Sequence, residues 1–262
     1  MADMQALKQL RDATFAPLKD CKEALDEANG NIDEAQEILK KKGILKAGKK
    51  GDRETNEGIV KLVKKDGRVA GIKLLCETDF VAKNEIFIQL ADTILDRLLA
   101  NKQELAWGDE VPTLEDVNTA IAEFVGKIGE NVRFTAAIVT NKPAYVYNHP
   151  GNKVASIIYF EGGSEDTAKE LALQVTAMCP TYLSFEDVPV DQREKLLAEF
   201  KEEMKDSWKP ANIIDQIIEG KLKKSLADVV LMEQEYIRDG SKKIKEVIPS
   251  DFKCSGFLRM SI

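Results

Sequence analysis

The stretch that decides the fold is residues 58–76, which read GIVKLVKKDGRVAGIKLLC. Apolar residues alternate or run together on both sides of Asp66-Gly67, as they do in β-strands. An Asp-Gly pair between two such segments is a strong signal for a tight hairpin turn. The stretch therefore predicts two antiparallel strands, at 58–64 and 68–76, joined by a short turn.

A helical period replaces the strand period after this hairpin. Residues 77–79 can cap a helix, and apolar residues then recur three and four positions apart from Ile86 to Leu98. A second helix is predicted over 114–128, and a strand over 132–139. The first half of the core therefore combines a hairpin, helices and a further strand.

The same pattern then returns. Strands are predicted at 144–148 and 153–160 around a turn, and a helix at 167–178. Residues 69–72 (VAGI) are echoed by residues 154–157 (VASI). We therefore expect an α+β fold whose core is a duplicated hairpin-plus-helix unit.

Further helical segments flank and interrupt this core. Residues 4–42 predict three short helices, so residues 1–43 are assigned to a three-helix N-terminal module, followed by a Lys- and Gly-rich linker at 44–56. Two charged amphipathic helices separated by Pro210 predict an inserted antiparallel helical hairpin. The remaining division is subdomain N at 57–140, subdomain C at 141–185 and 226–262, and the hairpin at 186–225.

Composition excludes several classes of function. His149 is the one histidine in 262 residues, which removes His-rich metal sites and most catalytic relays. The four cysteines are far apart and form no C-x-x-C pair, and the net charge of −7 argues against a general nucleic-acid binder. No segment is apolar for long enough to span a bilayer. We expect a cytoplasmic protein that is not an enzyme, uses no metal or cofactor, and binds neither membrane nor nucleic acid directly.

Two segments stand out from this general pattern. The first lies within residues 10–25 and contains LRDAT and DCKEAL, and the second is CETDFVAKN at 76–84. In the second, Phe80 follows the carboxylate of Asp79 at a strand-to-helix junction. Phe80 can be buried under its own helix, or it can form with Asp79 an exposed wedge that enters a partner's pocket. Aromatic anchors of the second kind dominate interface energies.

These segments resemble the elongation factor Ts family, the nucleotide exchange factors of the translational GTPase elongation factor Tu. Residues 10–25 match most of the family motif L-R-x-T-G-A-G-x-x-D-C-K-x-A-L, and residues 76–84 match the second half of E-x-N-C-E-T-D-F-V-A-x-N. The resemblance covers nearly the whole length and includes EGKLKK at 219–224 in the hairpin. It implies that the N-terminal module is of the ubiquitin-associated type.

The resemblance also implies a function, which is binding elongation factor Tu and accelerating GDP release during translation elongation. In the family, the Asp-Phe pair pushes between helices of the GTPase domain and disturbs the Mg²⁺ and phosphate environment. The matching residues here are Thr78, Asp79, Phe80 and Val81. Factor and nucleotide then weaken each other's binding by the same amount. Since no bond in GDP is broken, the step needs no acid, base or nucleophile.

Other partner contacts follow from the same resemblance. Arg11, Leu18 and Lys19 match the module surface that touches the GTPase domain, although Lys19 can equally be a solvated surface charge. His149 matches a Tyr-x-His stretch that contacts another domain of the GTPase, and a turn histidine can also simply be exposed. Ile237 lies in a short apolar contact segment, for which core packing is the alternative. The helical hairpin can bind a second factor, form a dimer or stay solvated.

Some residues depart from the family pattern. Phe15-Ala16-Pro17 replaces the Gly-Ala-Gly turn of the first motif, while Lys73 and Leu75 stand where Glu and Asn are usual. Two other functions compete with nucleotide exchange. A ubiquitin-type or peptide-binding adaptor would use the three-helix module alone, and an RNA-associated protein would use the lysines of 40–50. Neither gives a purpose to the segment at 76–84.

Overall fold

The computed structural model describes residues 4–14, 16–48, 51–101, 103–205 and 207–262. It mixes helices with small antiparallel sheets, which confirms the predicted α+β class. Within these residues, no helix is both long and apolar enough to cross a membrane. Contacts divide the chain into two compact units, which are residues 1–142 with 148–155 and 260–262, and residues 143–147 with 156–259.

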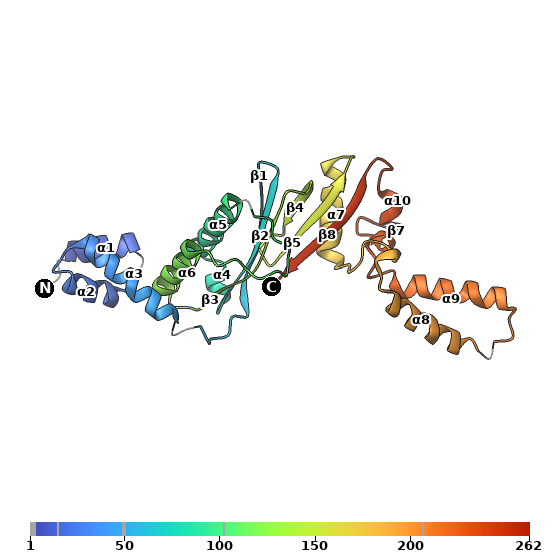
Figure 1. The fold of residues 1–262 in the computed structure, drawn as a ribbon, viewed down its shortest axis with the longest axis horizontal. Coiled ribbons are helices and arrows are strands. Elements are labelled where there is room, and N and C mark those ends of the chain that lie inside the picture. The colour runs from blue at the N-terminus through green and yellow to red at the C-terminus, as the bar shows by residue number, and fades with distance from the viewer. Residues whose placement is uncertain (1–3, 15, 49–50, 102, 206) are drawn as a thin grey trace. The chain divides into compact units, whose positions relative to one another are not determined.

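The chain opens with three helices, α1 (Met4–Thr14), α2 (Leu18–Glu27) and α3 (Ile32–Gly48), as predicted (Figure 1). Gly30 adopts a left-handed conformation (φ +87°) between α2 and α3. The side chain of Asn31 then accepts the first backbone N–H groups of α3. Apolar side chains of the three helices share one cluster, formed by Leu7, Leu10, Ala16, Cys21, Ala24, Leu25, Ala28 and Ala35.

Helix α3 continues to Gly48, whereas the Lys- and Gly-rich sequence predicts a linker over 44–56. Leu, Lys and Ala at 45–47 favour helix, and an interior glycine such as Gly43 costs only about 1 kcal/mol. Packing of α3 against helix α6 (Glu115–Ile128) compensates for that glycine. Turns and irregular backbone occupy residues 51–56, whereas Lys49 and Lys50 lie outside the described residues.

The predicted hairpin forms β1 (Glu57–Lys65) and β2 (Arg68–Cys76), and β2 also pairs antiparallel with β3 (Val132–Thr140). Both turn residues have positive φ, +51° at Asp66 and +76° at Gly67. This is the turn whose twist matches the right-handed twist of the flanking strands. The sheet order β1-β2-β3 places β2 in the centre, with its last residues beside the start of β3.

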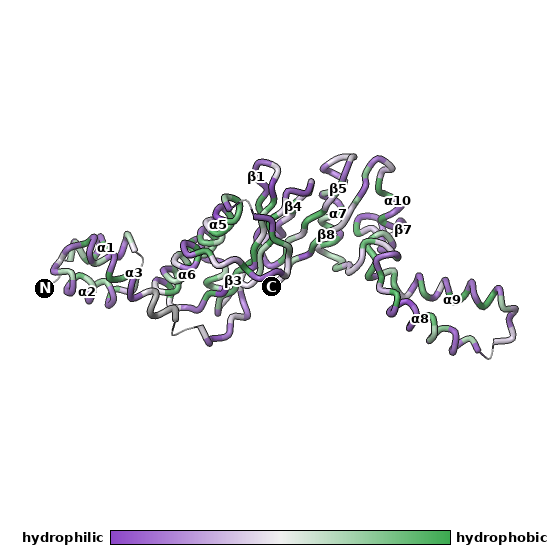
Figure 2. Tube along the Cα trace, in the orientation of Figure 1, coloured by the Kyte–Doolittle hydropathy of each residue, from purple (hydrophilic) through white to green (hydrophobic). Residues whose placement is uncertain are grey.

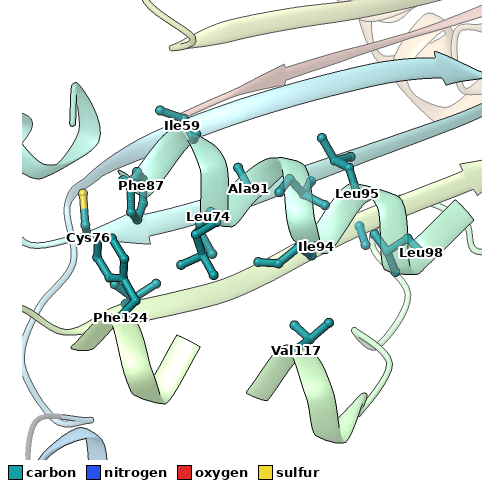
Figure 3. Close-up of a cluster of buried hydrophobic side chains, with 14 of the residues drawn as sticks. Ile59, Leu74, Cys76, Phe87, Ala91, Ile94, Leu95, Leu98, Val117 and Phe124 are labelled. Atoms are coloured by element: carbon teal, nitrogen blue, oxygen red, sulfur yellow. The ribbon is translucent and has the colours of Figure 1, made fainter. Parts of the chain in front are cut away.

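Helices α5 (Glu85–Ala100) and α6 cover this sheet and enclose the largest core of the first unit (Figure 3). Phe87 is fully buried, and its ring centroid lies 5.5 Å from that of Phe124. The helical period after β2 predicts one continuous helical stretch. Instead a short helix, α4 (Asp79–Ala82), precedes α5, because the Asn84 side chain accepts the N–H of Ile86 and starts a new helix there.

A second sheet has the order β4-β5-β8, with β4 (Ala144–Asn148), β5 (Val154–Glu161) and β8 (Lys253–Ser261). Helix α7 (Glu165–Met178) is capped by the side chain of Ser164 and packs its apolar face into a second core. The buried members of that core are Ile158, Ala168, Leu171, Ala172, Val175, Leu231, Ile244 and Phe252. Both halves of the predicted core therefore contain a three-stranded sheet and a packed helix.

The helical hairpin consists of α8 (Val190–Glu203) and α9 (Ala211–Leu226). The two helices are joined by an ion pair of 2.5 Å between Lys221 and Glu203, and the Lys221 ammonium lies 5.6 Å from the centroid of the Phe200 ring. Hydrophilic and hydrophobic residues alternate along both helices (Figure 2). No residue of α8 is buried, whereas α9 buries Ile218 and Leu226, so the hairpin contributes only a few side chains to a packed core.

Short elements complete the second unit. They are the 3-10 helices η1 (Phe185–Asp187) and η2 (Leu231–Glu233), the two-stranded sheet of β6 (Glu235–Tyr236) and β7 (Asp239–Lys243), and α10 (Ile244–Val247). The carboxylate of the buried Glu233 accepts hydrogen bonds from Lys243 at 2.8 Å and Lys245 at 2.7 Å. These charge-assisted contacts fix the ends of β7 and α10 against η2.

Candidate partner-binding site

The segment singled out by the sequence forms one tight turn after β2. Thr78 is the N-cap of α4, and its hydroxyl oxygen accepts the N–H of Val81 at 3.4 Å. Val81 and Ala82 are buried in the core, whereas the Phe80 side chain is 81% exposed. The structure thus places Phe80 in solvent, the second of the two arrangements that the sequence left open.

Two carboxylates brace this turn where β2 ends and β3 begins, Glu77 directly after β2 and Glu130 just before β3. The register of β2 against β3 places the residues after β2 beside those before β3. One oxygen of Glu130 accepts the Thr78 N–H at 3.0 Å, and the other accepts its hydroxyl at 2.7 Å. In return, the carboxylate of Glu77 accepts the N–H of Asn131 at 2.6 Å. Hydrogen bonds to ionised groups are about twice as strong as neutral ones, so the base of the turn is held firmly.

The Asp79 carboxylate accepts a hydrogen bond from Lys83 at 2.7 Å. That hydrogen bond lowers the pKa of Asp79, so its side chain is a carboxylate at neutral pH. The side chain is 45% exposed. The turn therefore presents an aromatic ring and a negative charge side by side to solvent.

A cysteine thiol lies beneath the turn. Cys76 is fully buried, and its Sγ donates to the carbonyl oxygen of Thr78 at 3.2 Å. Burial raises the pKa of this thiol to about 12, so it remains protonated and unreactive at neutral pH. The thiol thus adds a second hydrogen bond to a carbonyl oxygen that already accepts the N–H of Ala82 at 3.1 Å.

Comparison with known proteins identifies the family. The family model described as "Elongation factor TS" matches residues 77–262. The chain belongs to the elongation factor Ts family. It is 38% identical to elongation factor Ts of Hydrogenobaculum sp. over 98% of this chain and 97% of the relative. It is also 38% identical to the Aquifex aeolicus protein, over 94% of this chain and 91% of the relative.

Three of the remaining positions implied by the elongation factor Ts resemblance lie on the N-terminal helices. Arg11 is exposed in the last turn of α1. Leu18 begins α2 and is 53% exposed, and the neighbouring Lys19 forms an ion pair of 3.9 Å with Glu23. All three side chains are thus accessible to a partner.

The last two positions lie on turns of the core. His149 is exposed between β4 and β5, and its backbone N–H donates to the carbonyl oxygen of Val154 at 3.0 Å. Ile237 is 43% exposed between β6 and β7. The core-packing alternative for Ile237 therefore does not describe its side chain.

The departures from the elongation factor Ts pattern have local partners. The Lys73 ammonium donates to the carbonyl oxygen of Ser261 at 2.9 Å, so it ties the central strand β2 to the last strand. Leu75 is half-buried on β2 opposite Gly58. Phe15 lies outside the described residues.

Sequence reasoning missed residues that hold the contact segments in place. Two of them are Glu130 and Asn131, which could have been found from the pairing of β2 with β3. Another is the fully buried Gln174 of α7, whose Oε1 accepts the N–H of Ile237 at 3.0 Å. Its Nε2 donates to the carbonyl oxygen of Glu235 at 3.0 Å. A buried glutamine on a helical period resembles an ordinary core position, so no sequence signal marked it.

The charge of Glu130 allows a first prediction. Glutamine has the same shape, but its amide nitrogen cannot accept the N–H or the hydroxyl proton of Thr78. We expect Glu130→Gln to destabilise the turn by roughly 1–3 kcal/mol and to lower nucleotide-exchange activity. Activity and urea unfolding should be measured together, with Glu85→Gln, an exposed glutamate of α5, as the control. Wild-type activity in Glu130→Gln would show that the brace is not needed.

Within the part of the chain that the structure describes, no group of three or more His, Cys, Asp and Glu side chains could hold a metal ion. What the turn offers is an aromatic side chain and a carboxylate on a fixed backbone. This combination is suited to recognition of a protein surface.

Proposed function

We propose that this chain is a guanine-nucleotide exchange factor that binds elongation factor Tu and accelerates GDP release during translation elongation. Membership of the elongation factor Ts family supports this activity. The structural observation that carries the proposal is the 81% exposure of Phe80 between the braced Thr78 and the buried Val81. A phenyl ring held in water at a fixed position is a preformed anchor for an apolar pocket.

The energy of the step comes from burial of this ring between helices of the GTPase. Burying a phenylalanine side chain contributes roughly 1.5–3 kcal/mol. Since Glu130 already holds the turn, little conformational entropy is lost on binding. If the pocket opens only when the GDP site is distorted, the same free energy weakens GDP, and GDP weakens the factor equally.

Asp79 acts beside the ring through its charge. It is ionised and half-exposed, so it can exchange its hydrogen bond with Lys83 for donors of the GTPase. Nothing in this step breaks a bond in GDP. The proposal therefore includes no catalytic residue, metal or cofactor on the side of the factor.

The other exposed positions extend the interface. Arg11, Leu18 and Lys19 would touch the GTPase domain from the N-terminal helices, while His149 and Ile237 would contact another part of the GTPase. A dimer through α8 and α9 also belongs to the proposal, supported by the 59% exposure of Val190 and 37% exposure of Ile213. A role in translation elongation favours a cytoplasmic location.

The test is release of a fluorescent GDP analogue from purified elongation factor Tu, chased with unlabelled GDP. Substoichiometric amounts of this chain should accelerate release strongly, because each molecule leaves its partner and acts again. Circular dichroism of the same sample shows that the chain is folded. No acceleration by a folded sample would refute the exchange activity.

We expect a moderate effect from removing the charge next to the ring. Asp79→Ala should lower the exchange rate by roughly 3- to 10-fold, since a single exposed polar contact contributes about 1 kcal/mol. Lys83→Met is the matched variant, because it removes the intramolecular partner and keeps the carboxylate. It should retain activity. Equal losses in both variants would mean that the ion pair, not the carboxylate, is what the GTPase requires.

A further inference from the structure

Helix α3 crosses α6 at a point where two glycines meet. A Cβ atom placed on residue 126 would lie only 2.5 Å from the Cα of Gly43. A Cβ on residue 43 would lie 3.5 Å from both the Ala122 carbonyl oxygen and the Gly126 Cα, which is ordinary contact. The backbones therefore touch at Gly126, and only the side of α6 requires glycine.

The two helices belong to different parts of the first unit. Through Leu39 and its neighbours, α3 packs with the cluster of the N-terminal helices. Helix α6 is fixed in the core under the sheet by Phe124 and Val125, which are 3% and 2% exposed. Gly126 directly follows these anchors, so its position is set by the core.

A cavity and an ion pair lie beside this crossing. Beside the glycines the surfaces separate around a cavity of about 240 Å³, lined on its two sides by residues such as Thr14 and Lys127. An ion pair between the Lys40 ammonium and the Glu123 carboxylate, at 3.1 Å, spans the junction. Lys40 and Gly43 lie one turn apart on α3, as Glu123 and Gly126 do on α6. The glycine contact and this ion pair therefore lie side by side where α3 meets α6, and both depend on the orientation of the N-terminal helices.

From this geometry we infer that Gly126 is a positioning residue, which holds the N-terminal helices at a fixed orientation to the Asp79-Phe80 turn so that both bind one GTPase molecule as a rigid body. The expected effect on GTPase binding rests on the proposed exchange function, whereas the fixed orientation rests on the contact between α3 and α6 alone. Linking two contacts rigidly makes the second contact intramolecular. Loss of the rigid link should therefore lower the affinity for the GTPase, while the Asp79-Phe80 turn still acts once it is bound.

Matched alanine variants of the full chain test this. Exchange is measured with the fluorescent GDP analogue over a range of factor concentrations. We expect Gly126→Ala to raise the concentration for half-maximal release roughly 10-fold or more, with the maximal rate changed less than about 2-fold. Gly43→Ala makes the same chemical change on the facing helix and should behave as wild type. Alanine is the better helix former at both positions, so helix propensity cannot explain a loss.

A second measurement is independent of the GTPase. A carbodiimide joins a lysine to a carboxylate only in direct contact, and mass spectrometry can detect the Lys40–Glu123 cross-link. The cross-link should form in the wild type and in Gly43→Ala, and be strongly reduced in Gly126→Ala.

The outcomes separate the two proposals. Unchanged half-saturation in Gly126→Ala, or a loss confined to the maximal rate, would overturn the positioning role. An undiminished cross-link in Gly126→Ala would overturn the geometry of the crossing. If the wild type itself fails to accelerate GDP release while the cross-link behaves as expected, the exchange function is refuted and the crossing stands.

Discussion

Phe80→Ala is expected to reduce acceleration of GDP release by roughly 30-fold or more, the loss typical of an interface hot spot of at least about 2 kcal/mol. The ring is 81% exposed and is the largest apolar group that the turn offers to a partner. Alanine keeps the backbone of α4, the Thr78 cap and the Glu130 brace. The loss should therefore appear in the maximal rate of GDP release rather than in stability.

The chain offers a matched control for this variant. Trp208 lies between α8 and α9 and is 89% exposed, so Trp208→Ala also removes an exposed aromatic side chain. It should leave the maximal rate of GDP release unchanged. If Phe80→Ala exchanged nucleotide at the wild-type rate, the wedge assignment would be wrong even though the family is secure.

Phe87→Ala is expected to destabilise the first unit by about 3–5 kcal/mol, the range measured for buried phenylalanines replaced by alanine. Phe87 is fully buried and contacts Phe124 across α5 and α6 (Figure 3). The cavity left behind removes apolar contacts that the close-packed core cannot restore.

Urea unfolding measures this loss, and Phe80→Ala serves as its counterpart. The two phenylalanines are seven residues apart. Phe80→Ala should lower exchange without changing the free energy of unfolding, whereas Phe87→Ala should lower the free energy of unfolding first. A Phe87→Ala variant as stable as the wild type would contradict the packing described for α5 and α6.

The local signals of the sequence were strong where neighbouring residues determine the structure. Asp66-Gly67 fixed the hairpin turn, because positive φ at two successive positions is rare outside Asn, Asp and Gly. Helical periods likewise placed most helices within a few residues of their observed ends. The position of Phe80 at the junction after β2 followed from the same change of period.

Long-range pairing is where the sequence was silent. Whether Phe80 faced the core or solvent depended on which face of a four-residue helix met the sheet. Glu130 binds Thr78 across 52 positions of the chain, and this requires the register of β2 with β3. Asn84 ended one helix and began another through a single side-chain hydrogen bond, a choice that helical periodicity cannot reveal. In the sequence, Gly126 resembles any other glycine within a helix, because its contact with α3 depends on the tertiary structure.

The absence of any fully buried residue in α8 has a consequence for how the chain can change over evolutionary time. A hairpin that adds little to either core can open, shorten or lengthen while the sheets keep their free energy of unfolding. Selection for core packing is then weak at the positions of α8 and α9, and only partners that touch these helices restrict their sequence. The hairpin is thus the part of this fold most open to acquiring new binding partners.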